Sequence, residues 1–178
     1  MTNSVGLFKE DTMTKRQAIY SRFEAFEERL AHCYFLLQER FIAEPVLSRF
    51  WAEAALEELQ HHSMLRFCRE RGFMANVHLD DKRADEIEEL LDTVASILSD
   101  PKVSVDDAFY AALLMESSEL EEAYGELTSG LAKDHPILYE AIHASLRSHH
   151  ERFAEAAETF CSDRAFAGGF RNIGKLVS

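Results

Sequence analysis

Residues 56–65, LEELQHHSML, place two carboxylates and two imidazoles within six consecutive positions. The neighbouring residues are mostly apolar, as in a helix that packs against a core. Glu58 and His61 are three residues apart, so a helix would present both on one face, about 5–6 Å apart. Carboxylate oxygens and imidazole nitrogens are ligands that iron, manganese and zinc accept. The stretch therefore indicates either a metal site or the solvated edge of an amphipathic helix.

The same feature recurs along the chain, because every apolar helical face is interrupted by residues that can bind metal and none by Lys or Arg. These residues are Glu27, Glu58, His61, Glu116, Glu119 and His149. Any one of them alone is better explained as the edge of a helix. Buried carboxylates repel one another and take up protons, whereas four glutamates balance the charge of two divalent ions. Because the two halves of the chain repeat the pattern at nearly the same offset, the six together predict a two-metal site.

Four long helical segments would position these residues. Apolar residues recur in them at steps of three and four, and the segments are residues 14–41, 45–72, 104–130 and 136–161. Gly72 is a natural helix end, and Ser104 with Asp107 resembles a capping box. Residues 73–103 form a long connection with a shorter helix over residues 84–98. Two antiparallel helix hairpins joined by one long crossover predict an all-α four-helix bundle.

The length and composition set the broad class. A chain of 178 residues favours one domain, which we place at residues 1–162, followed by a tail at residues 163–178. The formal net charge of −13 argues against nucleic acid and anionic membranes as partners. No apolar run is long enough to span a membrane, and no signal-peptide pattern opens the chain. The three cysteines show no Cys-x-x-Cys spacing, which argues against a disulfide framework or a cysteine metal site. We therefore expect a cytoplasmic protein.

Four motifs carry a family resemblance: Glu27 with Tyr34, Glu58 with His61, Glu116 with Glu119 and Tyr124, and His149 with Arg152 and Phe153. Over about residues 14–160, their spacing resembles the ferritin-like superfamily, and its rubrerythrin-type di-iron proteins most closely. The resemblance implies a ferritin-like four-helix bundle whose centre holds two iron ions, with manganese or zinc as alternatives. It also implies that the six residues named above are the ligands, and that Fe(II) is oxidised while H₂O₂ or O₂ is reduced.

Two departures from the family pattern leave alternatives open. Leu146 stands where the fourth helix of the family carries a glutamate. Glu116 and Glu119 together would restore four glutamates and two histidines; otherwise one metal position is weakened or lost. The absence of Cys-x-x-Cys pairs means that there is no rubredoxin-like module, so an external electron donor would be needed. The alternatives to a redox enzyme are a non-catalytic helical scaffold with a degenerate site, and iron storage or buffering.

Several other residues are expected outside the ligand set. Glu57 and His62 lie one position off the metal-binding face and should support it indirectly or face solvent, as should three further histidines: His32, His143 and His150. Tyr34 and Tyr124 should be core tyrosines hydrogen-bonded near the site. We expect a homodimer.

The last residues allow two interpretations. The short apolar pattern at residues 173–176 is similar to the docking peptides with which ferritin-like cargo enters encapsulin shells. We favour instead a mobile tail, or one that lies on a partner subunit.

Overall fold

The computed structural model describes the backbone of residues 4–75, 81–117 and 119–176, and the side chains of residues 13–75, 82–117 and 123–175. Within these ranges helices are joined only by turns and short connections, which confirms the all-α class. The elements are α1 (Ser4–Arg40), α2 (Pro45–Arg71), α3 (Asp81–Leu98), α4 (Val105–Glu116), α5 (Glu119–Thr128), a 3₁₀ turn (Ser129–Leu131), α6 (Pro136–Phe160) and α7 (Ala165–Leu176). None of these described helices is both long and apolar enough to cross a membrane.

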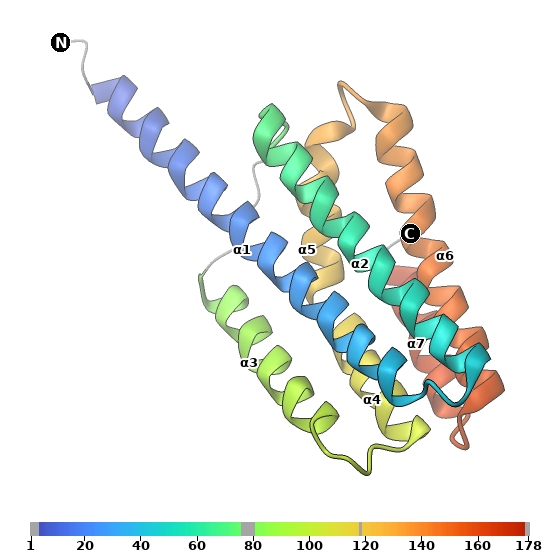
Figure 1. Ribbon diagram of the computed structural model, residues 1–178. Helices are drawn as coiled ribbons and strands as arrows, with labels where there is room; N and C mark the ends of the chain where they lie inside the picture. The colour runs from blue at the N-terminus through green and yellow to red at the C-terminus, as the bar shows by residue number, and fades with distance from the viewer. Residues whose placement is uncertain (1–3, 76–80, 118, 177–178) are drawn as a thin grey trace.

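Helices α1 and α2 lie side by side as an antiparallel hairpin (Figure 1). Pro45 occupies the first turn of α2, where its missing N–H would have no helical partner. Gly72 ends α2 with a left-handed φ of 75°, which a side chain would disfavour. The boundaries of α2 agree with the sequence prediction, whereas α1 begins at Ser4 rather than near residue 14.

Helix α3 is the short helix expected in the long connection, and it lies along α1 (Figure 1). Its buried face consists of Ala84, Ile87, Leu91, Val94 and Leu98. Arg22 and Arg29 of α1 form ion pairs with acidic residues of α3: Asp85, Glu88 and Asp92. These exposed pairs contribute little stability each, so the apolar face is what docks α3 on α1.

The prediction of one continuous third helix over residues 104–130 is wrong. The start is correct, because Ser104 and Asp107 exchange both hydrogen bonds of a capping box. However, α4 ends at Glu116 and α5 begins at Glu119, with the two helices following one another along the molecule (Figure 1). The Ser117 hydroxyl lies 3.4 Å from the Leu114 carbonyl oxygen. Such hydroxyl-to-backbone bonds compete with helix geometry, which explains an interruption here.

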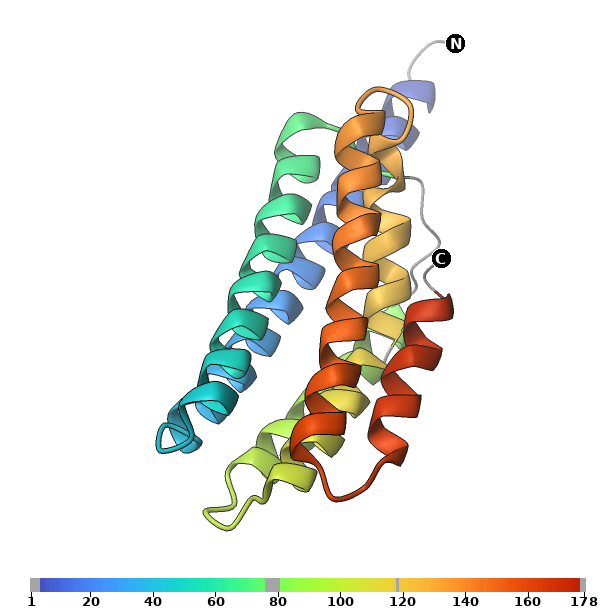
Figure 2. The same ribbon diagram turned by 90° about the vertical axis from the view of Figure 1, so that its right-hand side faces the viewer.

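The expected C-terminal tail is instead a helix over its described residues. Helix α7 packs on α6 and α4 (Figure 2). Phe170 is fully buried, with its ring centroid 5.1 Å from that of Phe153 on α6 and 6.4 Å from that of Phe109 on α4. A Cβ on Gly169 would lie only 2.9 Å from Leu113, so glycine permits this close approach. The expectation of a mobile tail is therefore wrong for residues 165–176.

A cluster of aromatic side chains fills the interior near the turn between α1 and α2. Trp51 is fully buried and lies 4.9 Å from Phe109 and 5.8 Å from Tyr34, measured between ring centroids. Phe153 of α6 completes the contact with Tyr34 at 5.7 Å. This apolar cluster lies next to a layer of buried polar side chains contributed by α1, α2, α4 and α6.

Candidate metal centre

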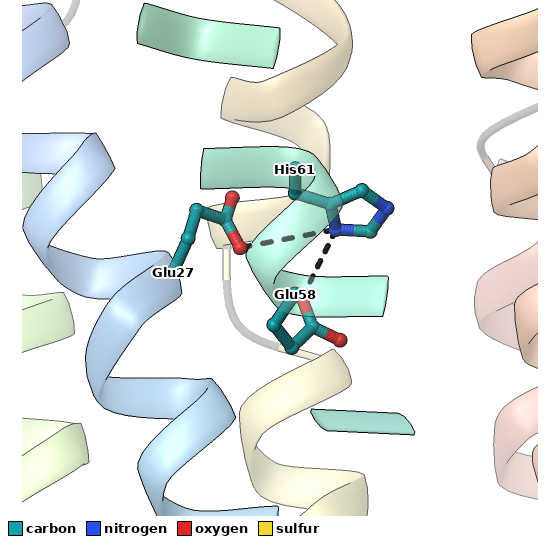
Figure 3. A group of neighbouring side chains, drawn as sticks. All are labelled: Glu27, Glu58 and His61. Carbon is teal, nitrogen blue, oxygen red and sulfur yellow. Dashed lines mark hydrogen bonds and ion pairs between the residues drawn. The ribbon is translucent and has the colours of Figure 1, made fainter. Parts of the chain in front are cut away.

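The α1–α2 hairpin brings Glu27, Glu58 and His61 together in the interior (Figure 3). Their side chains are buried, with exposed fractions of 1%, 0% and 6%. Nδ1 of His61 lies 3.0 Å from Oε2 of Glu58 and 3.8 Å from Oε2 of Glu27. Glu58 and His61 share a face of α2 because they are nearly one helical turn apart. The hairpin alone therefore supplies one group of three donors.

The second half of the chain supplies the remaining donors. Glu116 is the last residue of α4, and His149 lies on α6; each is 1% exposed. Nε2 of His149 lies 3.1 Å from Oε2 of Glu116 and 3.7 Å from Oε1 of Glu58. Glu58, Glu116 and His149 thus form a second group across three helices.

Glu58 belongs to both groups. In each group the three ligand atoms lie within 4.8 Å of one another. Oε2 of Glu58 faces His61, whereas Oε1 faces His149. One carboxylate therefore presents its two oxygens to two adjacent donor sets, so Glu58 would be the residue shared between two metal ions.

Several of these buried atoms lack a hydrogen-bond partner within the described part of the chain. In the second group they are Oε1 of Glu58, Oε2 of Glu116 and Nε2 of His149. The 3.1 Å contact between His149 and Glu116 brings the two atoms close but lacks the alignment of a hydrogen bond. Buried polar atoms without partners are rare and unfavourable. A cation that accepts oxygen and nitrogen ligands would satisfy all three, so the residues present fit a metal ion.

The electrostatics of the site also favour a positive charge at this point. Burial acts to raise the pKa of Glu116, but His149 and His150 outweigh it and hold that pKa well below its ordinary value. Burial acts to lower the pKa of His149, yet Glu116, Glu57 and Glu58 raise it well above the ordinary value. Without metal, a proton on His149 thus balances Glu116. A divalent ion would replace that proton.

Two tyrosines border the site, and the hydrogen bond expected of both is present for Tyr34. The Tyr34 hydroxyl donates a hydrogen bond of 2.5 Å to Oε1 of Glu116. Burial, followed by the charges of Glu116 and Glu58, raises the pKa of Tyr34, so the phenol keeps its proton. The ring of Tyr124 lies 4.5 Å from that of His61. Tyr34 therefore orients one carboxylate, and Tyr124 packs against one imidazole.

A pocket reaches the site from the surface beside His61 and Tyr124. Its volume is about 240 Å³, and its other lining residues come from α2 and α6: Gln60, Met64, Ala141, Ile142 and Ser145. A pocket of this size is large enough to hold water, dioxygen or peroxide beside His61.

Two further polar residues, Glu57 and His150, contact the predicted ligands. The sequence pattern left open whether they support the site or face solvent. Oε2 of Glu57 lies 2.7 Å from Nδ1 of His149, and Arg152 pairs with the other oxygen of Glu57. His150 is 1% exposed, and its Nε2 lies 3.6 Å from Oε2 of Glu116. The only sequence signal for His150 was the repetition of a His-His pair in both halves of the chain. His62 instead contacts the backbone carbonyl of Glu24 at 2.9 Å.

Of the six predicted ligands, the structure brings five together: Glu27, Glu58, His61, Glu116 and His149. The backbone of Glu119 begins α5, but its side chain lies outside the described residues. Leu146 is fully buried on α6, one turn before His149. That these side chains bind metal remains a prediction.

Comparisons with known proteins add no identification. No family model matches the chain, and no curated protein and no solved structure matches it significantly. The case for a metal centre therefore depends on the geometry and chemistry of the donors themselves.

Proposed function

We propose that this chain is a ferritin-like four-helix bundle that holds two metal ions at its centre, with iron as the metal. Helices α1, α2 and α6, together with the α4–α5 pair, would form the bundle, and α3 would lie in the crossover. The observation that carries the proposal is the pair of buried donor groups that share Glu58. The unpartnered oxygen and nitrogen atoms of the second group support it.

The donor set suits iron. Glutamate oxygens and imidazole nitrogens are hard to borderline ligands, which iron, manganese and zinc accept and which soft ions such as Cu(I) do not prefer. Glu27, Glu58 and Glu116 supply three negative charges for two divalent ions, and Glu119 would supply the fourth. His61 and His149 would each give one nitrogen ligand to one ion.

The reaction that this arrangement supports is oxidation of Fe(II) coupled to reduction of peroxide or dioxygen. Two bound Fe(II) ions would supply the two electrons that, with two protons, reduce H₂O₂ to two molecules of water. The chain contributes a water-poor interior, a Glu116 carboxylate held in place by Tyr34, and a small pocket beside His61. An external electron donor would return the two electrons.

Metal analysis after anaerobic reconstitution with Fe(II) tests the proposal. We expect about two iron ions per chain in the wild type and a large loss in Glu58→Gln, which removes the shared charge. Glu140→Gln is the matched control, because Glu140 and His143 repeat the Glu-x-x-His spacing on α6 away from the donor groups. Wild-type protein that binds no iron, manganese or zinc would overturn the proposal.

A second candidate function is a helical scaffold whose metal site has degenerated. The buried Leu146 favours it, because an apolar side chain stands where the family pattern has a carboxylate.

Iron storage or buffering is the third candidate. Metal-loaded protein that fails to oxidise Fe(II) with added H₂O₂ in a stopped-flow absorbance assay would support storage over the redox reaction.

A further inference from the structure

Glu57, His149 and Arg152 form a chain of contacts on the outer side of the second donor group. Glu57 is on α2, next to Glu58, whereas His149 and Arg152 are three residues apart on α6. One oxygen of Glu57 lies 2.7 Å from Nδ1 of His149. Its other oxygen pairs with the Arg152 guanidinium. The His149 and Glu57 side chains are 1% and 17% exposed, so little solvent competes for the contact between them, whereas the Arg152 side chain is 43% exposed.

This arrangement determines which nitrogen of His149 keeps its proton when the ring is neutral, as a metal-binding imidazole must be. A guanidinium has only donors, so it holds Glu57 as a carboxylate, which can only accept. Nδ1 of His149 must then be the donor. In a neutral imidazole the other nitrogen, Nε2, is left with its lone pair, and Nε2 is the atom that faces Glu58 and Glu116.

We propose that Glu57 and Arg152 act as positioning residues that fix His149 in the tautomer able to bind metal through Nε2. The inference depends on the proposed function, because it assigns these residues a role toward the ion held by the second donor group. Neither residue would touch the metal. Carboxylates hydrogen-bonded to ligating histidines commonly raise metal affinity in this way.

A glutamine at position 57 would reverse the tautomer for a reason specific to this structure. Its amide has one accepting oxygen and one donating nitrogen. Because Arg152 can only donate, the amide oxygen must turn to Arg152 and the amide nitrogen to His149. Nδ1 then has to accept, which moves the proton to Nε2 and blocks the metal position.

Removing the arginine should therefore restore metal affinity to the Glu57→Gln variant. In Glu57→Gln combined with Arg152→Met, no donor holds the amide oxygen, so the amide can rotate and offer that oxygen to Nδ1. Arg152→Met alone leaves the Glu57 carboxylate in place as an acceptor. A purely structural role of the two residues predicts the opposite order, with the double variant at least as impaired as either single variant.

The experiment measures Fe(II) and Co(II) affinity by chelator competition, together with the absorption spectrum of the Co(II)-loaded protein. We expect Glu57→Gln to bind the ion at the second donor group about 10–100-fold more weakly than the wild type does. The double variant should recover most of the lost affinity. Glu53→Gln is the control, since Glu53 pairs with Arg49 on the exposed side of α2. Urea unfolding of each metal-free variant shows whether it is folded.

The outcomes separate this inference from the proposed function. A wild type that binds no metal overturns the proposed function, and the inference with it. A wild type that binds two ions, with Glu57→Gln unchanged in affinity and Co(II) spectrum, overturns the inference alone. A double variant weaker than Glu57→Gln also overturns the tautomer argument, even if Glu57 matters for folding.

Discussion

Replacing Phe170 by alanine tests whether α7 is part of the folded core. The Phe170 side chain is fully buried between α7, α6 and α4, in contact with Phe153 and Phe109. Removing a buried phenylalanine ring costs about 3–5 kcal/mol, since the transfer free energy is lost and a cavity remains. For a chain of this length each kcal/mol lowers the melting temperature by about 2–4 °C. We therefore expect a fall of about 6–20 °C.

Circular dichroism of the metal-free protein, during heating and during urea titration, measures this change. Ile137→Ala is the control, because Ile137 is 87% exposed on α6 and its loss should leave the melting temperature nearly unchanged. A fall in Phe170→Ala no larger than in the control would refute the packing described for α7. Deletion of residues 165–178 should then also be harmless, whereas we expect it to destabilise the protein strongly.

Three further predictions concern the metal centre and one helix end. His61→Ala should lower metal content and affinity strongly, measured by elemental analysis and chelator competition, whereas His62→Ala should change them little; equal effects would mean that the wrong face of α2 was assigned to the site. Leu146→Glu should keep about two ions per chain but destabilise the metal-free fold by about 1–3 kcal/mol in urea titration, because it buries one more carboxylate. A rise from one ion to two would instead show that Leu146 has emptied one position. Ser104→Ala should lower the free energy of unfolding by about 0.5–2 kcal/mol, since the first turn of α4 loses its cap; no change would show that the capping box contributes nothing.

The sequence predicted those parts of the fold that depend on local signals. The apolar periodicity, the proline and glycine boundaries of α2 and the capping box at Ser104 all act within one helix. The interruption after Glu116 was missed because serines weaken a helix without forbidding it. Helix α7 was missed because its glycines suggest a tail, and the packing of buried residues such as Phe170 on other helices supplies the missing stability.

The candidate site was predictable to the extent that it follows from helix faces. Glu58 and His61 share a face by spacing alone, and the buried position of Glu27 follows from the apolar residues around it. The contact between Glu57 and His149 joins two helices whose relative rotation is not encoded in either helix alone. For the same reason, spacing along α6 could not show that His150 also reaches Glu116.

The glycines of α7 have a consequence for how the protein opens. Three of its twelve residues are Gly168, Gly169 and Gly174, and each glycine weakens a helix by about 1 kcal/mol relative to alanine. A helix this short is not stable in isolation, so α7 exists because it is docked. Gly174 sits against His150, where an added Cβ would lie 3.2 Å from the Cβ of the histidine. Local detachment of α7 would therefore expose one side of His150 to solvent. Amide hydrogen exchange should then be faster in α7 than in α2. Helix α7 would be a segment whose detachment controls the solvent exposure of His150.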